Sequence, residues 1–264
     1  MSTSRPLETG WLPDTPVGDT LLRRFLFSQA EVNEITASAT GGQAERTDDV
    51  VLADSGTPVP YLNQAILTRP LVGAGDDVLD VIDEFFTGVT RPITLLSMWP
   101  TPDLSRQGWN LAGHPAMVAR APAPIDFRSP SDVEVRAADT PHDFAVAEQL
   151  AVEGYPMAEA ADLPPGSLFP PKLADMGLTV RLGLLEGTPV GVGNVHVSNG
   201  VVNLCLGATL TEARRRGVWE SLVWSRVAEE PTLPSVAYTS DYSRPGFLRM
   251  GFLPITRFTL WVSA

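Results

Sequence analysis

The chain has 264 residues, of which 44% are hydrophobic and 19% are charged, and its formal net charge is −12. This composition is typical of a folded protein, and so large an excess of acids disfavours nucleic acid as a general partner. No apolar run approaches the ~20 residues that span a bilayer, and residues 1–19 lack the basic and apolar regions of a secretory signal. The single cysteine, Cys205, cannot form an internal disulfide, which fits a reducing compartment. We therefore expect a cytoplasmic protein with no membrane or nucleic-acid partner.

The first half of the chain carries alternating helix and strand signals. Residues 1–20 are expected to form an arm. A helix is predicted to begin at Asp19-Thr20, because the apolar residues of 21–26 follow at helical spacing. The elements predicted after it are strands over 50–53 and 60–67, a helix over 76–88, and strands over 93–98 and 114–121.

A stretch rich in proline and serine separates the two halves. Residues 121–124 read Ala-Pro-Ala-Pro, and residues 129–132 read Ser-Pro-Ser-Asp. Proline fits poorly inside a helix or a central strand, so we place a boundary here. The predicted organisation is an arm over 1–20, an N-terminal domain over 21–128 and a C-terminal domain over 133–264.

The second half has a more regular pattern. Asn199-Gly200 lies between two apolar runs and is a strong signal for a two-residue hairpin. The predicted elements are strands over 133–136, 178–185, 190–197, 201–210, 236–239 and 258–262, helices over 141–153, 216–229 and 244–250, and a loop-rich segment over 154–171. The strand over 258–262 is predicted to close the C-terminal sheet.

The strand over 201–210 leads through a short loop into a helix, and that joint favours an anion. The first amides of a helix have no intrahelical partner, and the helix dipole adds positive potential at the same place. A diphosphate suits such a site. Arg214, Arg215 and Arg216 can pair with phosphate oxygens, and Gly217 lets a ligand approach the backbone closely. The alternative is a solvated first helical turn with no ligand.

Two phrases in this half resemble the GNAT acyltransferase family. Arg214-Arg215-Arg216-Gly217-Val218-Trp219 resembles the pattern Gln/Arg-x-x-Gly-x-Gly/Ala, which begins the helix after the family's fourth strand. Residues 247–252, Phe-Leu-Arg-Met-Gly-Phe, resemble the Tyr-x-x-x-Gly-Phe-like phrase at the end of the next helix. One helix and one strand separate the two phrases, as in the family, and the resemblance covers residues 133–264.

The resemblance implies an α/β (α+β) protein with a GNAT fold, in which a mixed, mostly antiparallel sheet is flanked by helices, built as two GNAT-like halves. It implies acetyl-CoA or another acyl-CoA as co-substrate, and no metal. The main chain of 208–210 would pair with the pantetheine arm, and the amides of 216–219 would hold the pyrophosphate. The implied cofactor-binding residues are Ala208, Thr209, Leu210, Arg214, Arg215, Arg216, Gly217, Val218, Trp219 and Phe247.

The first half resembles the degenerate first half of tandem GNAT proteins. The similarity lies in residues 60–65, Pro-Tyr-Leu-Asn-Gln-Ala, and in the helix, the strand and the residues 115–117 that follow. No Arg/Gln-x-x-Gly-x-Gly phrase is present, so this half is expected to shape the substrate cleft without binding the cofactor. The alternative is an unrelated α+β lid.

Three residues depart from the family pattern. Trp219 stands where the family has Gly or Ala, and Ser240 stands where an Asn often follows the fifth strand. Phe247 stands where many members carry the Tyr that protonates the leaving thiolate, and Phe has no proton to give. Tyr242, five residues earlier, is the substitute acid that the sequence offers.

The general base has several candidates. His196 lies on a strand that can face the cleft, and the pKa of a histidine suits a base near neutral pH; the alternative is a packed or surface histidine. The carboxylates Glu153, Glu159, Asp162 and Asp241 are further candidates, each with the alternative of a solvated acid. The predicted catalytic residues are Tyr242, His196 and Ser240.

The predicted reaction is transfer of an acetyl group to a primary amine of a small molecule or a protein, by direct attack of the amine on the thioester. One alternative is a GNAT-fold protein that binds acyl-CoA as a sensor or assembly module, which the loss of the tyrosine at Phe247 favours. Another is a structural dimerisation module without a ligand. Each is compatible with a homodimer, which we leave open.

Overall fold

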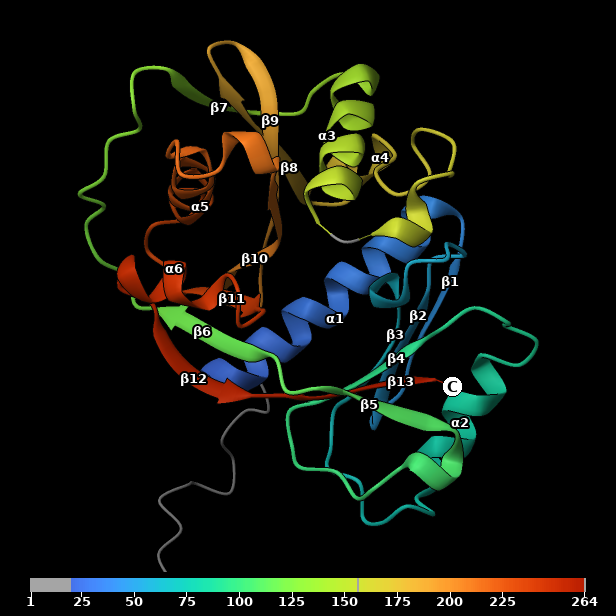
Figure 1. Cartoon of the computed structure of the whole chain (residues 1–264). Coiled ribbons are helices and arrows are strands. Elements are labelled where there is room, and N and C mark those ends of the chain that lie inside the picture. The colour runs from blue at the N-terminus through green and yellow to red at the C-terminus, as the bar shows by residue number, and fades with distance from the viewer. Residues whose placement is uncertain (1–19, 156, 264) are drawn as a thin grey trace, which may run out of the picture.

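The computed structural model describes residues 20–155 and 157–263 of the chain. This part consists of two β-sheets with flanking helices, and helix α1 (Leu21–Thr40) runs between the sheets (Figure 1). The predicted arm lies outside the described residues except for Thr20, whose hydroxyl accepts a hydrogen bond from the Arg23 amide (3.2 Å) and caps α1. Within these residues, no helix combines the length and apolar content that a membrane crossing needs.

Sheet A holds most strands of the first half, in the order β1-β2-β3-β4-β13-β5. Strands β3 and β4 are parallel, and the other neighbours are antiparallel. Helix α2 (Asp77–Phe85) packs Val78, Leu79 and Ile82 against buried residues of β2, β3 and β4. The strands are β1 (Gln43–Arg46), β2 (Val50–Asp54), β3 (Asn63–Leu67), β4 (Thr94–Ser97), β5 (Trp109–Gly113) and β13 (Thr259–Ser263).

Sheet B has seven strands in the order β12-β6-β11-β10-β9-β8-β7. Strands β10 and β11 are parallel, and the other neighbours are antiparallel. The predicted hairpin at Asn199-Gly200 is confirmed, because it joins β9 to β10 with φ values of 50° and 70°. The strands are β6 (Ala116–Arg120), β7 (Val133–Ala137), β8 (Leu178–Leu185), β9 (Thr188–Ser198), β10 (Val201–Thr209), β11 (Ser235–Thr239) and β12 (Leu253–Arg257).

Helices cover both faces of sheet B (Figure 1). Helix α3 packs on the face that carries Val180 and Leu182, together with part of α1. Helices α5 and α6 pack on the other face, where Val223 of α5 and Phe247 of α6 contact Leu204 of β10 and its neighbours. The helices are α3 (Pro141–Gly154), α4 (Lys172–Asp175), α5 (Val218–Val227) and α6 (Arg244–Arg249), with short 3-10 turns at Pro60–Leu62, Ser105–Gln107, Ala158–Ala160 and Thr211–Ala213.

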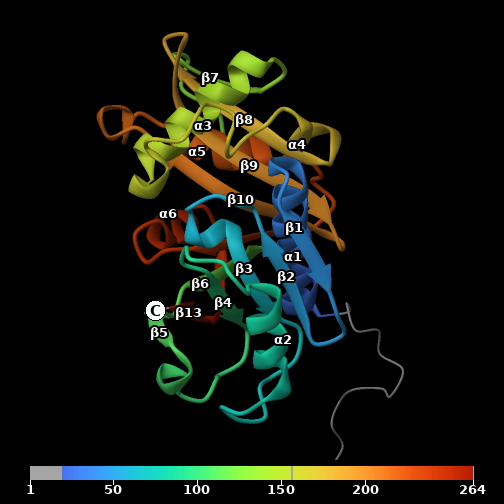
Figure 2. The same ribbon diagram turned by 90° about the vertical axis from the view of Figure 1, so that its right-hand side faces the viewer.

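The two halves of the chain exchange strands. Strand β6, which precedes the proline-rich linker, lies in sheet B between β11 and β12. Strand β13, from the end of the second half, lies in sheet A between β4 and β5. The prediction that residues 258–262 close the C-terminal sheet is therefore wrong, and the strand predicted over 114–121 belongs to sheet B, whereas all the strands before it in the sequence belong to sheet A. Figure 1 shows the segment that joins β5 to β6 beside the segment that joins β12 to β13, where the sheets meet. Figure 2 shows β6 and β13 at the same junction from another side.

The core between the sheets is built around α1. Phe25 and Leu26 of α1 are fully buried. They pack with Phe258, which directly precedes β13, and with Val201 and Val236 of sheet B. Burial of side chains of this size is the largest favourable term in folding. The sheets are therefore joined by a continuous apolar core as well as by the exchanged strands.

Candidate functional site

Sheet B is split along part of its length. Strand β10 pairs with β11 only over residues 202–204, although both strands continue further. A bulge after Leu204 interrupts the pairing of β10 with β9 at the same place, and a bulge bends the strand that contains it. On the side of β11, residues 205–209 of β10 consequently have no strand partner within residues 20–155 and 157–263.

The guanidinium of Arg226 lies against this bulge. Arg226 is 1% exposed, and it donates hydrogen bonds to the carbonyl oxygens of Asn194 (3.2 Å) on β9 and Leu206 (2.5 Å) on β10. Burial lowers the pKa of Arg226 to about 10. The two carbonyls lie on neighbouring strands directly after the bulge. This side chain therefore stabilises the bend in β10 at which the split from β11 begins.

The loop between β10 and α5 presents backbone amides at the same end of the split. Arg215 and Gly217 both adopt positive φ, 64° and 85°. No side chain of the described residues caps α5, and the helix hydrogen bonds begin with the Ser221 amide donating to the Gly217 carbonyl (2.9 Å). The amides before Ser221 therefore lie at the open, positive end of the helix dipole.

The three arginines of this loop have different partners. Arg214 donates to the main-chain carbonyls of Thr209 (3.2 Å) and Gly154 (3.4 Å). Arg216 forms ion pairs with Asp132 (2.9 Å) and Glu186 (3.5 Å), away from the split. Arg215 is exposed. It is the loop arginine without an ion-pair or hydrogen-bond partner among the described residues.

The linker between the halves packs against the same loop. A Cβ atom added to Gly217 would lie 2.7 Å from Cγ of Pro130, so only glycine fits here. Phe127 stacks on Trp224 of α5, with ring centroids 6.1 Å apart. Together with the ion pair between Arg216 and Asp132, these contacts hold the side of the loop that faces the linker. The amides at the start of α5 lie on the side of the loop that faces the split.

Trp219 lies on the α5 and α6 face, below the split. Its indole packs edge-on against Phe247, with ring centroids 5.1 Å apart. A Cβ atom added to Gly246 of α6 would lie 2.6 Å from the ring, and one added to Gly207 of β10 would lie 3.8 Å from Nε1. The indole thus spans from β10 to α6. Phe247 is itself 6% exposed and also packs on Phe252.

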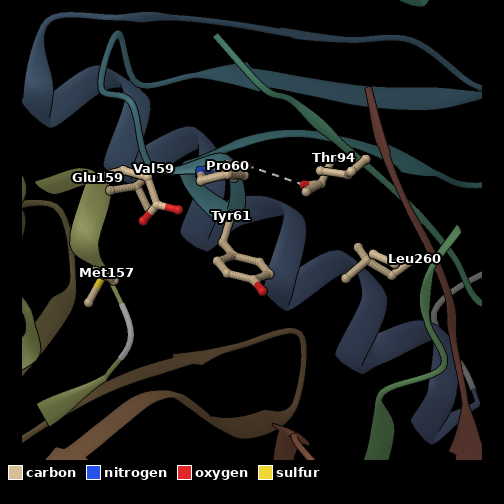
Figure 3. Close-up of a pocket in the computed structure, with 9 residues that line it drawn as sticks. Val59, Pro60, Tyr61, Thr94, Met157, Glu159 and Leu260 are labelled. Atoms are coloured by element: carbon tan, nitrogen blue, oxygen red, sulfur yellow. Dashed lines mark hydrogen bonds between the residues drawn. The ribbon is translucent and has the colours of Figure 1, made fainter. Parts of the chain in front are cut away.

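On the opposite face of sheet B, a cleft of about 570 Å³ lies between the two halves. Tyr61, His114 and Leu260 line it from the side of sheet A. It continues into a smaller cavity of about 120 Å³ that also contacts Thr94 and Glu159. Figure 3 shows Tyr61 pointing into this cavity, with Met157 on one side and Leu260 on the other. The lining residues from the second half are Tyr155, Tyr238, Ser240, Asp241 and Arg257.

Three tyrosines approach one another in this cleft. The hydroxyl of Tyr238, on β11, is buried and has no hydrogen-bond partner among the described residues. Burial raises the pKa of Tyr238 well above its usual range, and the neighbouring phenols of Tyr61 and Tyr155 raise it further. Tyr238 therefore stays protonated at neutral pH, with a proton to donate. Thr209, at the end of β10, also has a buried hydroxyl without a hydrogen-bond partner in the described part of the chain.

The predicted catalytic residues lie in three different environments. Ser240 lines the cleft and is within hydrogen-bond distance of Ser243 (3.3 Å). Tyr242 is 87% exposed and is not among the residues that line the cleft. His196 is 7% exposed, and its two ring nitrogens lie 2.9 Å from the Gly177 carbonyl oxygen and 3.2 Å from the Glu31 carboxylate. His196 thus joins β9 to α1, away from the cleft.

Two of the predicted carboxylates line the cleft or its inner cavity. Asp241 accepts a hydrogen bond from Arg257 (2.6 Å), and this bond and the charge of Arg257 lower the pKa of Asp241. Glu159 lines the inner cavity without an ion-pair or hydrogen-bond partner in the described part of the chain. No group of three or more potential metal-binding side chains occurs within residues 20–155 and 157–263.

Sequence reasoning did not select Tyr238. Its position next to the end of a predicted strand was visible, but many aromatic residues at strand ends are simply part of the core. What distinguishes Tyr238 is the buried, unpartnered hydroxyl, which depends on residues brought together from both halves.

Solved structures that share this fold cover nearly the whole chain. A GCN5-related N-acetyltransferase from Kribbella flavida is 16% identical with a TM-score of 0.59, and the match covers 89% of this chain and 95% of that one. A putative acetyltransferase from the GNAT family of Novosphingobium aromaticivorans is 13% identical with a TM-score of 0.54, covering 88% and 97%. A GCN5-related N-acetyltransferase from Sphaerobacter thermophilus is 12% identical with a TM-score of 0.52, covering 96% of both chains.

These similarities establish a GNAT fold, with two mostly antiparallel sheets flanked by helices, as the resemblance implied. A conserved protein of unknown function from Staphylococcus epidermidis also shares the fold, with 11% identity and a TM-score of 0.58. No family model matches the sequence, and no curated protein is significantly similar to it. The structural similarity shows the fold, and the reaction and its substrate are argued from the site itself.

Proposed function

We propose that this protein transfers an acetyl group from acetyl-CoA, or another acyl group from its acyl-CoA, to a primary amine held in the cleft between the two halves. The observation that carries the proposal is the split between β10 and β11. It lies between the open amides of α5 on one face of sheet B and the cleft on the other face. Both diverging strands carry a buried hydroxyl that has no hydrogen-bond partner among the described residues, at Thr209 and at Tyr238. Such groups are rare in folded proteins unless a ligand or water completes them.

Two features of this arrangement support acyl-CoA as the ligand. The amides of 216–219 and the exposed side chain of Arg215 would hold the pyrophosphate. The main-chain edge of Ala208 and Thr209, free of a strand partner on the side of β11, would receive the pantetheine arm like an added strand. Arg214 supports this edge through its bond to the Thr209 carbonyl, and Arg216 fixes the loop through Asp132.

Tyr238 is the proposed proton donor in place of the tyrosine that Phe247 replaces. In the reaction, the amine nitrogen attacks the thioester carbonyl carbon, the C–S bond breaks, and the departing sulfur takes a proton. Phe247 is buried among Trp219 and Phe252 and has no proton to give. The Tyr238 hydroxyl is protonated, has no hydrogen-bond partner among the described residues and belongs to a side chain that lines the cleft. It can therefore donate a proton to the thioester oxygen or to the leaving sulfur.

Glu159 is the proposed acceptor of the proton that the amine loses. Its carboxylate lines the inner cavity without a cationic partner among the described residues, whereas Asp241 is paired with Arg257. An unpaired carboxylate would also attract the ammonium form of the acceptor before its deprotonation. Ser240, at the rim of the cleft, would orient the acceptor by a hydrogen bond.

The proposal is tested by release of free thiol from acetyl-CoA in the presence of a panel of primary amines. We expect release that depends on both the amine and the protein, and a rise in melting temperature with acetyl-CoA alone, because a ligand that binds only the native state stabilises it. If calorimetry gives no heat and the melting temperature does not move, the cofactor proposal is wrong.

The second candidate is a catalytically inactive protein that binds acyl-CoA as a sensor or assembly module. The burial of Phe247 at the position of the family's acid favours it. The two candidates differ in one measurement: a sensor shows the thermal shift with acetyl-CoA but releases no thiol with any amine of the panel.

A further inference from the structure

Trp219 occupies the side of sheet B from which a pantetheine arm would enter the split. The indole lies on the α5 and α6 face, where it reaches Gly207 on the free portion of β10 and Gly246 on α6. The helix amides that would hold a pyrophosphate lie on the same face, at the residues that carry the indole. The cleft lies on the other face. A chain running from the amides to the cleft has to pass the position that the indole fills.

We propose that Trp219 is a plug, whose indole must leave the space between β10 and α6 before acyl-CoA can bind, so that this side chain sets the protein's affinity for acyl-CoA. The inference rests on the proposed function, because it concerns the entrance to the proposed cofactor site. It assigns to the indole of Trp219 a role in controlling access, which is separate from the contacts that would hold the cofactor.

The contacts that hold the indole are compatible with such a movement. Trp219 packs on Phe247 and against two glycines, and its Nε1 atom has no hydrogen-bond partner in the described part of the chain. By contrast, the buried Trp261 donates from Nε1 to the Thr101 hydroxyl (2.9 Å). Trp219 is partly exposed, in the first turn of α5. Its indole can therefore turn toward solvent without breaking a hydrogen bond.

If the indole closes the site in most molecules, the apparent affinity for a ligand equals the affinity of the open form multiplied by the fraction of molecules that are open. Two substitutions should raise the open fraction by different routes. Trp219→Ala removes the plug. Gly246→Ala keeps the indole but places a methyl group 2.6 Å from its ring, so the ring must shift from the closed position. Alanine is also a better helix former than glycine, so α6 tolerates this change.

The experiment is calorimetric titration of CoA and of acetyl-CoA into the full-length wild-type protein, Trp219→Ala, Gly246→Ala and the double variant. We expect both single variants to bind about tenfold tighter than the wild type, as when one molecule in ten is open. The double variant should bind no tighter than Trp219→Ala, because the methyl group has no indole left to displace. Trp99→Ala is the matched control: this tryptophan is also partly buried, packs in the cores around sheet A and should leave the affinity unchanged.

The outcomes separate this inference from the proposed function. Equal affinity of the wild-type and both single variants overturns the plug and leaves the cofactor proposal standing. Weaker binding by Trp219→Ala overturns it as well, because the indole would then contribute to the site. No binding by any of the proteins overturns both. If Trp219→Ala does not fold, the comparison of Gly246→Ala with the wild type decides the question.

Discussion

Asn33 of α1 donates a hydrogen bond of 2.9 Å to the side-chain oxygen of Gln64 on β3, in the core between the two sheets. The bond is the centre of a chain of side chains. Asn203 of β10 donates to Gln29, Gln29 donates to Asn33, and Gln64 donates to the hydroxyl of Thr94. This chain runs from sheet B through α1 to sheet A and ends at the wall of the inner cavity. A polar network of this kind specifies how the two sheets pack.

Asn33→Ala should destabilise the protein by about 1–3 kcal/mol, because the buried oxygen of Gln64 loses its donor. The free energy of unfolding in urea is the measurement. Asn110→Ala, on the exposed surface of β5, is the control and should change stability by less than about 0.5 kcal/mol. Equal losses in the two variants would show that the network does not stabilise the sheet contact.

Tyr238→Phe should lower thiol release by about a hundredfold or more, the range expected for loss of a proton donor. It should leave stability unchanged or slightly raised, because the hydroxyl makes no hydrogen bond within the described residues. Tyr242→Phe tests the acid that the sequence suggested, and with 87% of that side chain exposed we expect nearly full turnover. A large loss in Tyr242→Phe together with full activity in Tyr238→Phe would reverse the assignment.

Gly217→Ala should weaken both folding and acyl-CoA binding. The residue has a φ of 85°, and an added methyl group would meet Pro130 at 2.7 Å. The left-handed conformation alone costs an alanine about 1–2 kcal/mol. Gly251→Ala separates the two causes, because Gly251 has a φ of 82° and open space around its Cα atom. Thermal unfolding should show a larger loss for Gly217→Ala, and the affinity for CoA should fall only in that variant.

Lowering the pH should reduce the free energy of unfolding by weakening the N-terminal cap of α3. Asp143 closes the capping box of this helix with Thr140, and its hydrogen bond from Arg136 (2.5 Å) holds the pKa of Asp143 well below the ordinary value of 3.8. A carboxyl with a lowered folded pKa stabilises the protein above its unfolded pKa, and this contribution is lost as the pH falls toward the folded value.

The test compares the free energy of unfolding at about pH 6 and about pH 3, on either side of an ordinary carboxyl pKa. The wild type should lose more stability between these conditions than Asp143→Asn does. Asp162→Asn, at an exposed aspartate, should behave like the wild type. If Asp143→Asn and the wild type lose the same free energy of unfolding between these pH values, Asp143 is not the cause of the acid sensitivity.

The sequence predicted the parts of the fold that local signals determine. Strand β8 spans Leu178–Leu185 as predicted, and α3 begins at Pro141 behind its threonine cap. The strand–loop–helix joint at Gly217 also lies where the apolar pattern and the arginine run placed it. In each case, the residues that determine the element are its own neighbours in the chain.

The exchange of strands could not be predicted in this way. The apolar pattern of 259–263 is the same whether the strand joins sheet B or sheet A, and its partner Leu95 is distant in the sequence. The same limit applies to the site. Nothing local marks the hydroxyl of Tyr238 as unpartnered, because its environment includes Tyr61 from the other half.

The exchanged strands also restrict how the protein can move. Two lobes joined by a single linker can close around a ligand by rotating about a hinge. Here the chain crosses between the sheets twice, from β5 to β6 and from β12 to β13, and α1 packs against both sheets, so a hinge rotation would have to bend both crossings and separate α1 from one of the sheets. The distance between the walls of the cleft is consequently set by the fold. Room for acceptors of different size has to come from side chains such as Tyr61, Met157 and Glu159.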